Sequence, residues 1–311
     1  MEKVDKPDDK FFKKAFENVD NVRLFLKRFL PTSIRDAIDI EGMALDNSNY
    51  VSDHLKESLA DLVVKTTIKT KSKERSQTDI YILMEHKSYR DSKVLVQMLM
   101  YMALMWQKDV NEKKPLRVIL PYVFYHGEEK WTVPHSFVEQ FNVEDEIKGF
   151  LLDYRYLLFD TWEWDMSDSS NEEIRKNYFL FSALALMKHV QNMDLSGIES
   201  LFRYWSETGF IHHPELFMVC LLYISEKKDM EPEELKKLFE KSKIDGGEIM
   251  PTLAQRWIDE GKQYGRKEGR QEGERLNKLE IARNMLLRDY SIEEVAVITG
   301  LKEEEIKRLI N

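Results

Sequence analysis

The sequence predicts an α/β protein in which a mixed sheet core flanked by helices is followed by an all-helical C-terminal region. Two observations predict this class. Up to about residue 160, strand-like stretches are interleaved with helical patterns, whereas only helical patterns follow from about residue 171. The 311 residues suffice for about two domains. We expect a sheet domain over 1–168, a helical domain over 169–260 and a small tail with a glycine-repeat helix over 261–311.

The first half of the sheet domain begins with a helix. Apolar residues at helical spacing predict one amphipathic helix over 9–30, which Pro31 ends, and a loop then runs to about residue 57. Alternating residues predict a strand over 61–68. A β-branched and aromatic run predicts a second strand over 79–87, and because it is apolar on both faces we expect it to be central.

The second half contains a helix that is apolar almost all round, over 92–108, and we therefore expect it to be buried. Strand-like runs follow over 116–125 and 154–159. The helical region carries further helical patterns, over 173–192, 197–208, 214–226, 231–241 and 250–260.

Composition excludes several functional classes. Lys and Arg number 47 and Asp and Glu 56, so the net charge of −9 speaks against a protein that coats nucleic acid. The longest apolar stretches are about half the roughly 20 residues that span a bilayer, and the charged start does not resemble a secretory signal. The single cysteine, Cys220, lies in an apolar run, which indicates a buried structural thiol. We expect a cytoplasmic protein without a membrane partner.

The C-terminal tail has an unusual rhythm. Glycines recur every four residues from Gly261 to Gly273, which could permit close helix pairing or simply give a flexible linker. Two short helices are expected over 291–298 and 302–310, around Gly300. Residues 291–311 carry five acidic and three basic residues, so we favour packing or homo-oligomerisation through the C-terminal helices over DNA reading.

A candidate site lies at the end of the second strand. Side chains two apart on a strand share a face, so Glu85 and Lys87 point the same way and His86 the other. Asp61 begins the preceding strand and would lie beside Glu85 if the two strands are antiparallel neighbours. Two carboxylates with a lysine suit metal-assisted phosphodiester cleavage, with Mg²⁺ held by hard oxygen ligands.

Other interpretations remain open for these residues. Glu85 and Lys87 could form an interstrand ion pair with no chemistry. Gln97 and Tyr101 are four residues apart on the apolar helix and share a face. A glutamine there needs a hydrogen-bond partner, which could be the sheet, the site or a nucleic-acid backbone.

Several segments carry a resemblance to a known family. They read DKFFKKAF at 9–16, ESLADL at 57–62, YILMEHKS at 81–88, Gln97-x-x-x-Tyr101 and Tyr125-His126-Gly127, followed by a matching tail over 274–311. In this order they resemble the recombination-promoting nuclease (Rpn) family, also called YhgA-like transposases, of the PD-(D/E)XK nuclease superfamily. The likeness spans nearly the whole chain.

The resemblance implies a restriction-endonuclease-like core over 1–168 and an Mg²⁺-dependent DNA endonuclease, with Mn²⁺ as the other candidate metal. Asp61 and Glu85 become metal ligands, Lys87 the catalytic lysine, and Gln97 and Tyr101 supporting residues. Many members of the family carry glutamine at the position of Lys87. Ala60 replaces the proline of the motif, which we do not interpret as loss of activity.

A local basic patch could meet DNA. Residues 65–93 carry eight basic and four acidic side chains, a net charge of +4. The candidate phosphate contacts are Lys69, Lys71, Lys73, Arg75 and Arg90. A solvated loop is the other interpretation of 69–75. The rival to a nuclease is a catalytically inactive DNA-associated or protein-interaction module that keeps the fold, and transposition has only the family's other name in its favour.

Overall fold

The structure is a computed structural model of the chain, and it divides into two compact units, 1–246 and 247–311, which are described separately. The residues that it describes are 7–46, 62–69, 79–191, 194–228, 232–244, 278–279, 281–283, 285–286 and 291–300.

A five-stranded mixed sheet forms the centre of the first unit, with its strands in chain order. The strands are β1 (Ala44–Leu45), β2 (Leu62–Thr67), β3 (Asp79–Lys87), β4 (Val118–Tyr125) and β5 (Leu157–Asp160). The pairs β1–β2 and β2–β3 are antiparallel, whereas β3–β4 and β4–β5 are parallel. The predicted mixed sheet is therefore confirmed, and β3 is its central strand, buried along almost its whole length.

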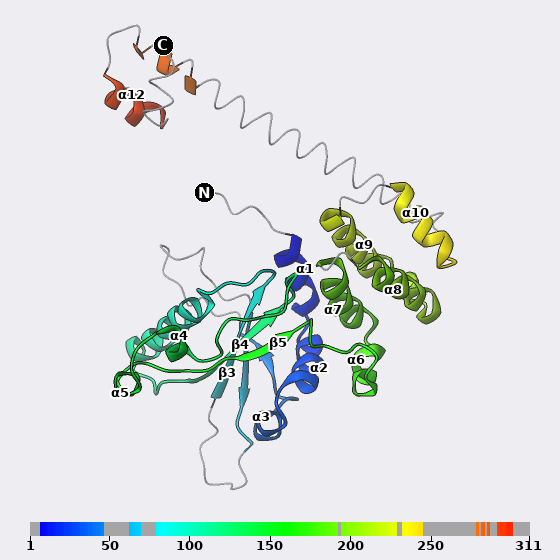
Figure 1. The fold of residues 1–311 in the computed structure, drawn as a ribbon, viewed down its shortest axis with the longest axis horizontal. Helices are drawn as coiled ribbons and strands as arrows, with labels where there is room; N and C mark the ends of the chain where they lie inside the picture. The colour runs from blue at the N-terminus through cyan, green and yellow to red at the C-terminus, as the bar shows by residue number, and fades with distance from the viewer. Residues whose placement is uncertain are drawn as a thin grey trace. The chain divides into compact units, whose positions relative to one another are not determined.

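Helices cover both faces of this sheet (Figure 1). On one face lie α1 (Pro7–Phe16) and α2 (Val19–Phe29), and on the other lies α4 (Val94–Asn111). Phe12 of α1 packs against the rings of His86 and Phe124, which project from β3 and β4. Side chains of the opposite parity, such as Leu83 and Val123, belong to the core beneath α4.

The single helix predicted over 9–30 is wrong. The backbone of Asn18 is extended, and its side chain accepts a hydrogen bond from the backbone N–H of Asp20 at 2.9 Å. Asn18 therefore caps a new helix and separates α1 from α2. The predicted loop through residue 57 also contains regular structure, namely α3 (Thr32–Ala37) and β1.

The expectation that the helix over 92–108 is buried holds for only one of its faces. One face of α4 lies on the sheet, with Leu95, Met98 and Met102 buried. Val96 and Met100 on the outer face are 44% and 46% exposed. The apolar pattern of the sequence overstates burial here because single apolar side chains are common on protein surfaces.

The helical region packs beside α1. The helix predicted over 173–192 divides at Asn177, whose side chain accepts a hydrogen bond from the N–H of Leu180 and so starts a second helix. Cys220 is buried, as predicted, and burial raises the pKa of its thiol. The helices of this region are α6 (Glu172–Lys176), α7 (Tyr178–Gln191), α8 (Leu195–Thr208), α9 (Pro214–Lys228) and α10 (Pro232–Lys241).

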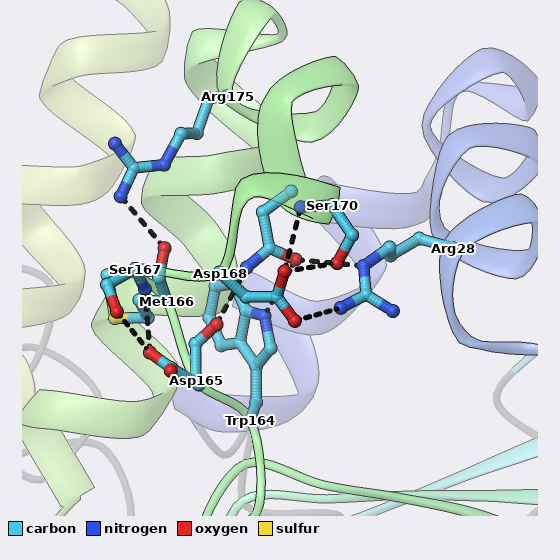
Figure 2. Close-up of polar contacts among 9 residues, drawn as sticks. Arg28, Trp164, Asp165, Met166, Ser167, Asp168, Ser170 and Arg175 are labelled. Atoms are coloured by element: carbon cyan, nitrogen blue, oxygen red, sulfur yellow. Dashed lines mark hydrogen bonds and ion pairs between the residues drawn. The ribbon is translucent and has the colours of Figure 1, made fainter.

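Polar contacts join α2 to the connection between β5 and α6 (Figure 2). The Arg28 guanidinium donates to Asn171 Oδ1 at 3.1 Å and forms an ion pair with Asp168 at 3.4 Å. Asn171 in turn donates from Nδ2 to the carbonyl oxygen of Asp165 at 2.7 Å. The chain is thus held against α2 where the sheet ends and the helices begin. The shorter elements there and between β4 and β5 are η2 (Phe137–Gln140), α5 (Asp145–Lys148) and η3 (Ser169–Asn171).

The second unit is described in part. The helix α12 (Ile292–Thr299) begins at a capping box between Ser291 and Glu294, and ends at Gly300, which has a left-handed φ of 68°. Val295 and Ala282 form a small buried cluster. The predicted helices over 250–260 and 302–310 and the glycine repeat from Gly261 to Gly273 lie outside the described residues.

Candidate functional site

The end of β3 places two opposite charges side by side in the core. Glu85 and Lys87 are only 4% and 7% exposed, although both are charged residue types that rarely lie so deep. Lys87 Nζ lies 3.2 Å from Glu85 Oε1. The strand alternation that predicted a shared face for these two side chains is therefore confirmed.

Helix α4 supplies the residues that hold the pair. Gln97 Nε2 donates to Glu85 Oε1 at 2.6 Å, and Gln97 Oε1 accepts from Lys87 Nζ at 2.7 Å. The same Nε2 donates to the Tyr101 hydroxyl at 2.6 Å, one turn further along the helix. All four residues thus form one hydrogen-bonded network, and the partners of Gln97 are Glu85 and Lys87 of the sheet and Tyr101 of its own helix.

Sequence reasoning missed a fifth member of this network, Asp91. Its Oδ2 lies 3.0 Å from Lys87 Nζ, and its Oδ1 accepts a hydrogen bond from the backbone N–H of Lys93 at 2.9 Å. An aspartate just before an apolar helical run is a usual signal of a helix start. That signal predicts a cap, but it does not predict that the other oxygen reaches a buried lysine.

Lys87 stays charged in this setting. Burial alone would lower its pKa, but the charge of Glu85 and the ion pair with Asp91 outweigh that effect and raise the pKa of Lys87 above its ordinary value. An ammonium group stabilises developing negative charge, whereas a general base must be neutral. The raised pKa of Lys87 therefore suits an electrostatic role better than the role of base.

Asp61, the other carboxylate of the predicted pair, lies outside the described residues. The antiparallel strand pairing that this predicted pair requires is present, between β2 and β3. Leu62, which follows Asp61 in the sequence, pairs with Met84, which precedes Glu85. In the described part of the chain, no three His, Cys, Asp or Glu side chains gather in a way that could hold a metal ion.

The donor atoms at the site are nevertheless of the kind that Mg²⁺ prefers. The carboxylates of Glu85 and Asp91 and the amide oxygen of Gln97 surround Lys87 Nζ. The positive charge of the Lys87 ammonium thus lies among hard oxygen atoms. This chemistry fits a divalent cation at Glu85, provided that a further carboxylate joins it.

The predicted DNA contacts are described only in part. Lys69 is exposed directly after β2, while Lys71, Lys73 and Arg75 lie outside the described residues. Arg90 donates to the carbonyl oxygen of Lys130 at 2.9 Å and forms an ion pair with Glu129 at 2.9 Å. A phosphate that binds Arg90 would have to compete with this carboxylate.

Comparison with known proteins shows which family the chain belongs to. Residues 6–208 match the family described as "Putative transposase, YhgA-like", and the chain belongs to this family. The match includes the whole sheet and the network around Glu85.

Two relatives from Escherichia coli (strain K12) are similar over nearly their whole length. The chain is 26% identical over 305 residues to "Recombination-promoting nuclease RpnA", and the match covers 96% of both chains. It is 24% identical over 311 residues to "Inactive recombination-promoting nuclease-like protein RpnE", again with 96% of both chains covered. The resemblance to the recombination-promoting nucleases is therefore confirmed.

No solved structure matches the chain. Among the helices that the structure describes, none combines the length and the apolar character needed to cross a membrane.

Proposed function

We propose that the chain is a metal-dependent DNA endonuclease of the PD-(D/E)XK type. The observation that carries this proposal is the buried network in which Gln97 of α4 holds both Glu85 and Lys87 of β3. A buried ion pair that only stabilised the fold would gain little, because desolvation offsets most of its Coulomb energy. An acid and a lysine at the end of a central strand suit phosphodiester chemistry, and one relative is named a nuclease.

Each residue has a definite part in this proposal. Asp61 and Glu85 would hold Mg²⁺ or Mn²⁺, which polarises a phosphoryl oxygen and lowers the pKa of a bound water. Lys87 directs its ammonium toward the negative charge that develops on the phosphate. Gln97 and Tyr101 orient the Glu85 carboxylate. The water oxygen bonds to phosphorus and releases a proton to solvent, the bond to the leaving sugar oxygen breaks, and that oxygen takes up a proton from solvent.

The experiment is cleavage of supercoiled and linear DNA by the full chain with Mg²⁺ or Mn²⁺, followed by mapping of the ends. We expect Asp61→Ala, Glu85→Ala and Lys87→Ala to cut DNA far more slowly than the parent. The matched control is Asp79→Ala at the other end of β3, where Asp79 pairs with Lys65 at 2.8 Å. Unimpaired cutting by the three site variants would exclude this site.

An inactive member of the family is the second candidate function, because one relative of similar identity is named inactive. Such a protein would keep the fold and bind DNA or protein without cutting. A bound metal raises the stability of the folded state by mass action. A melting temperature that rises with Mg²⁺ in the parent but not in Glu85→Ala supports the nuclease, whereas no rise and no cutting in the parent supports the inactive module.

DNA is the partner that the proposal requires. Lys69, Lys71, Lys73 and Arg75 lie between β2 and β3 in the chain, and Arg90 follows β3, so all flank the proposed site in sequence. If they contact phosphates, binding should weaken steeply with salt, and neutralising them should reduce the salt dependence. Unchanged salt dependence in Lys71→Ala/Lys73→Ala/Arg75→Ala would assign DNA contact to other residues.

A further inference from the structure

Asp91 links Lys87 to the start of α4. It lies four residues beyond the lysine, in the short connection between β3 and the helix. One carboxylate oxygen lies 3.0 Å from Lys87 Nζ, and the other accepts the backbone N–H of Lys93 at 2.9 Å. A single side chain thus joins the lysine of the strand to the backbone from which Gln97 projects.

Three oxygen atoms surround the Lys87 ammonium, and they are not equivalent. Glu85 Oε1 lies at 3.2 Å, Asp91 Oδ2 at 3.0 Å and Gln97 Oε1 at 2.7 Å. If Glu85 holds a divalent cation, that cation repels the Lys87 ammonium. The repulsion offsets the attraction between the Glu85 carboxylate and the ammonium. The amide of Gln97 is neutral and cannot balance a buried charge. Asp91 is then the carboxylate that still holds the lysine.

The turn that Asp91 forms before α4 does not account for this arrangement. Asparagine or serine could also accept the Lys93 N–H, since their side chains form the same kind of turn. The negative charge of Asp91 is needed only for the contact with Lys87, and the Asp91 side chain is itself only 16% exposed.

We propose that Asp91 is the positioning residue that keeps the Lys87 ammonium aimed at the reacting phosphate while Glu85 holds the metal. This inference rests on the nuclease function proposed above. The contacts of Asp91 are with Lys87 Nζ and the Lys93 N–H, so its part in this proposal is to act through Lys87.

The first test compares the rate of DNA cutting by the full chain at saturating and subsaturating DNA. We expect Asp91→Asn, which keeps the acceptor for the Lys93 N–H, to lower kcat about 10- to 100-fold with little change in KM. In a Lys87→Gln background the same substitution should have no further effect, because its only target is gone. The control is Asp165→Asn, in a turn of the same kind outside the site, where Asp165 accepts the Ser167 N–H at 2.8 Å, and it should cut like the parent.

Two outcomes would overturn the proposal. One is Asp91→Asn cutting at the parental rate. The other is an equal loss in the parental and the Lys87→Gln backgrounds, which would mean that Asp91 acts independently of the lysine.

A second measurement does not depend on cutting, so failure of the nuclease function is distinguishable. The rate at which the Lys87 amine is acetylated in the presence of Mg²⁺, followed by mass spectrometry, reports how tightly this buried side chain is held. We expect Lys87 to react several-fold faster in Asp91→Asn, while Lys188, bound to the Trp164 carbonyl at 3.0 Å, reacts at the parental rate. Unchanged acetylation of Lys87 would overturn the proposal even if the parent does not cut DNA.

Discussion

Gln97 Nε2 donates to Glu85 Oε1 at 2.6 Å, while the other end of the same amide accepts from Lys87 Nζ at 2.7 Å. An amide has one donor end and one acceptor end, so it matches an acid and a base placed two residues apart on a strand. Neither a glutamate nor a lysine could make both contacts. One side chain of α4 therefore fixes the positions of both charged groups of β3.

We expect Gln97→Leu to be costly for both stability and function. Leucine has a similar volume, but it leaves Glu85 and Lys87 without their amide partner in a buried setting. The free energy of unfolding should fall by about 1–3 kcal/mol, measured by urea denaturation. The rise in melting temperature with Mg²⁺ should shrink as well, because the Glu85 carboxylate loses its orientation.

Tyr101→Phe is the matched control for this prediction. It removes one acceptor for Gln97 Nε2 but leaves the contact of that nitrogen with Glu85. We expect a loss of about 0.5–1.5 kcal/mol and a preserved response to Mg²⁺. Equal effects of the two substitutions would contradict the central role of Gln97.

On the opposite face of the sheet, the ring of His126 stacks on that of His86, with the two Nε2 atoms 2.5 Å apart. Burial, together with the charge of His86, lowers the pKa of His126 from an ordinary 6.5 to about 3. Between these values the unfolded chain binds a proton that the folded protein does not, so stability should rise as the pH rises from about 3 to about 6.5.

His126→Gln should remove this part of the pH dependence. Chemical denaturation from pH 4 to 8 would show a parental stability that falls below pH 6.5 more steeply than that of the variant. The control is His135→Gln, because His135 is exposed, although its ring also stacks on another ring, that of Tyr156. Parallel curves for parent and His126→Gln would contradict the prediction.

A buried ion pair joins α1 to α9. Asp8 accepts from the Tyr223 hydroxyl at 2.9 Å and pairs with Lys227 at 3.0 Å. Burial acts to raise the pKa of Asp8, but the charges of His126 and Lys227 and the hydrogen bonds from Lys227 and Tyr223 lower it below the ordinary 3.8. The resulting stability is present above pH 3.8 and is lost as the pH falls through the lower pKa of the folded state.

Asp8→Asn should therefore cost about 1–3 kcal/mol at pH 7, with the difference from the parent disappearing in strong acid. Urea denaturation at pH 7 and below pH 3 measures both effects. Glu173→Gln breaks an ion pair with Lys27 that is exposed to solvent, and it should change stability by less than about 0.5 kcal/mol. A deficit of Asp8→Asn that persists unchanged in acid would show that its charge is not the cause.

The sequence was sufficient to predict the strands because their signals are local. The continuous apolar run of β3 indicates a central strand, and its alternation places Glu85 and Lys87 on one face. The helix breaks at Asn18 and Asn177 were not predicted, since each depends on one side chain that caps a backbone N–H. Apolar periodicity continues across such a break and conceals it.

The site was predictable as far as spacing on a single element allows. Gln97 and Tyr101 share a face of one helix, so their contact follows from helical geometry. The approach of Gln97 to Lys87 depends on how α4 packs on the sheet, which no local pattern specifies. Asp91 was missed for the same reason, because its contact with Lys87 requires the particular turn between β3 and α4.

Gly197, near the start of α8, offers a test of the packing between α7 and α8. Alanine in a helix is normally about 1 kcal/mol better than glycine. Here a Cβ atom would fall far inside the van der Waals distance of His189 Nδ1, and that ring is held by Asp194 at 2.7 Å. We therefore expect Gly197→Ala to destabilise the protein by about 1–3 kcal/mol.

The control is Gly149→Ala, in which the added Cβ would have only an ordinary contact with the Glu146 carbonyl. That variant should be as stable as the parent or slightly more stable. Thermal denaturation measures the melting temperatures of both variants. A Gly197→Ala protein as stable as Gly149→Ala would mean that His189 moves aside at no cost in stability, which would contradict the prediction.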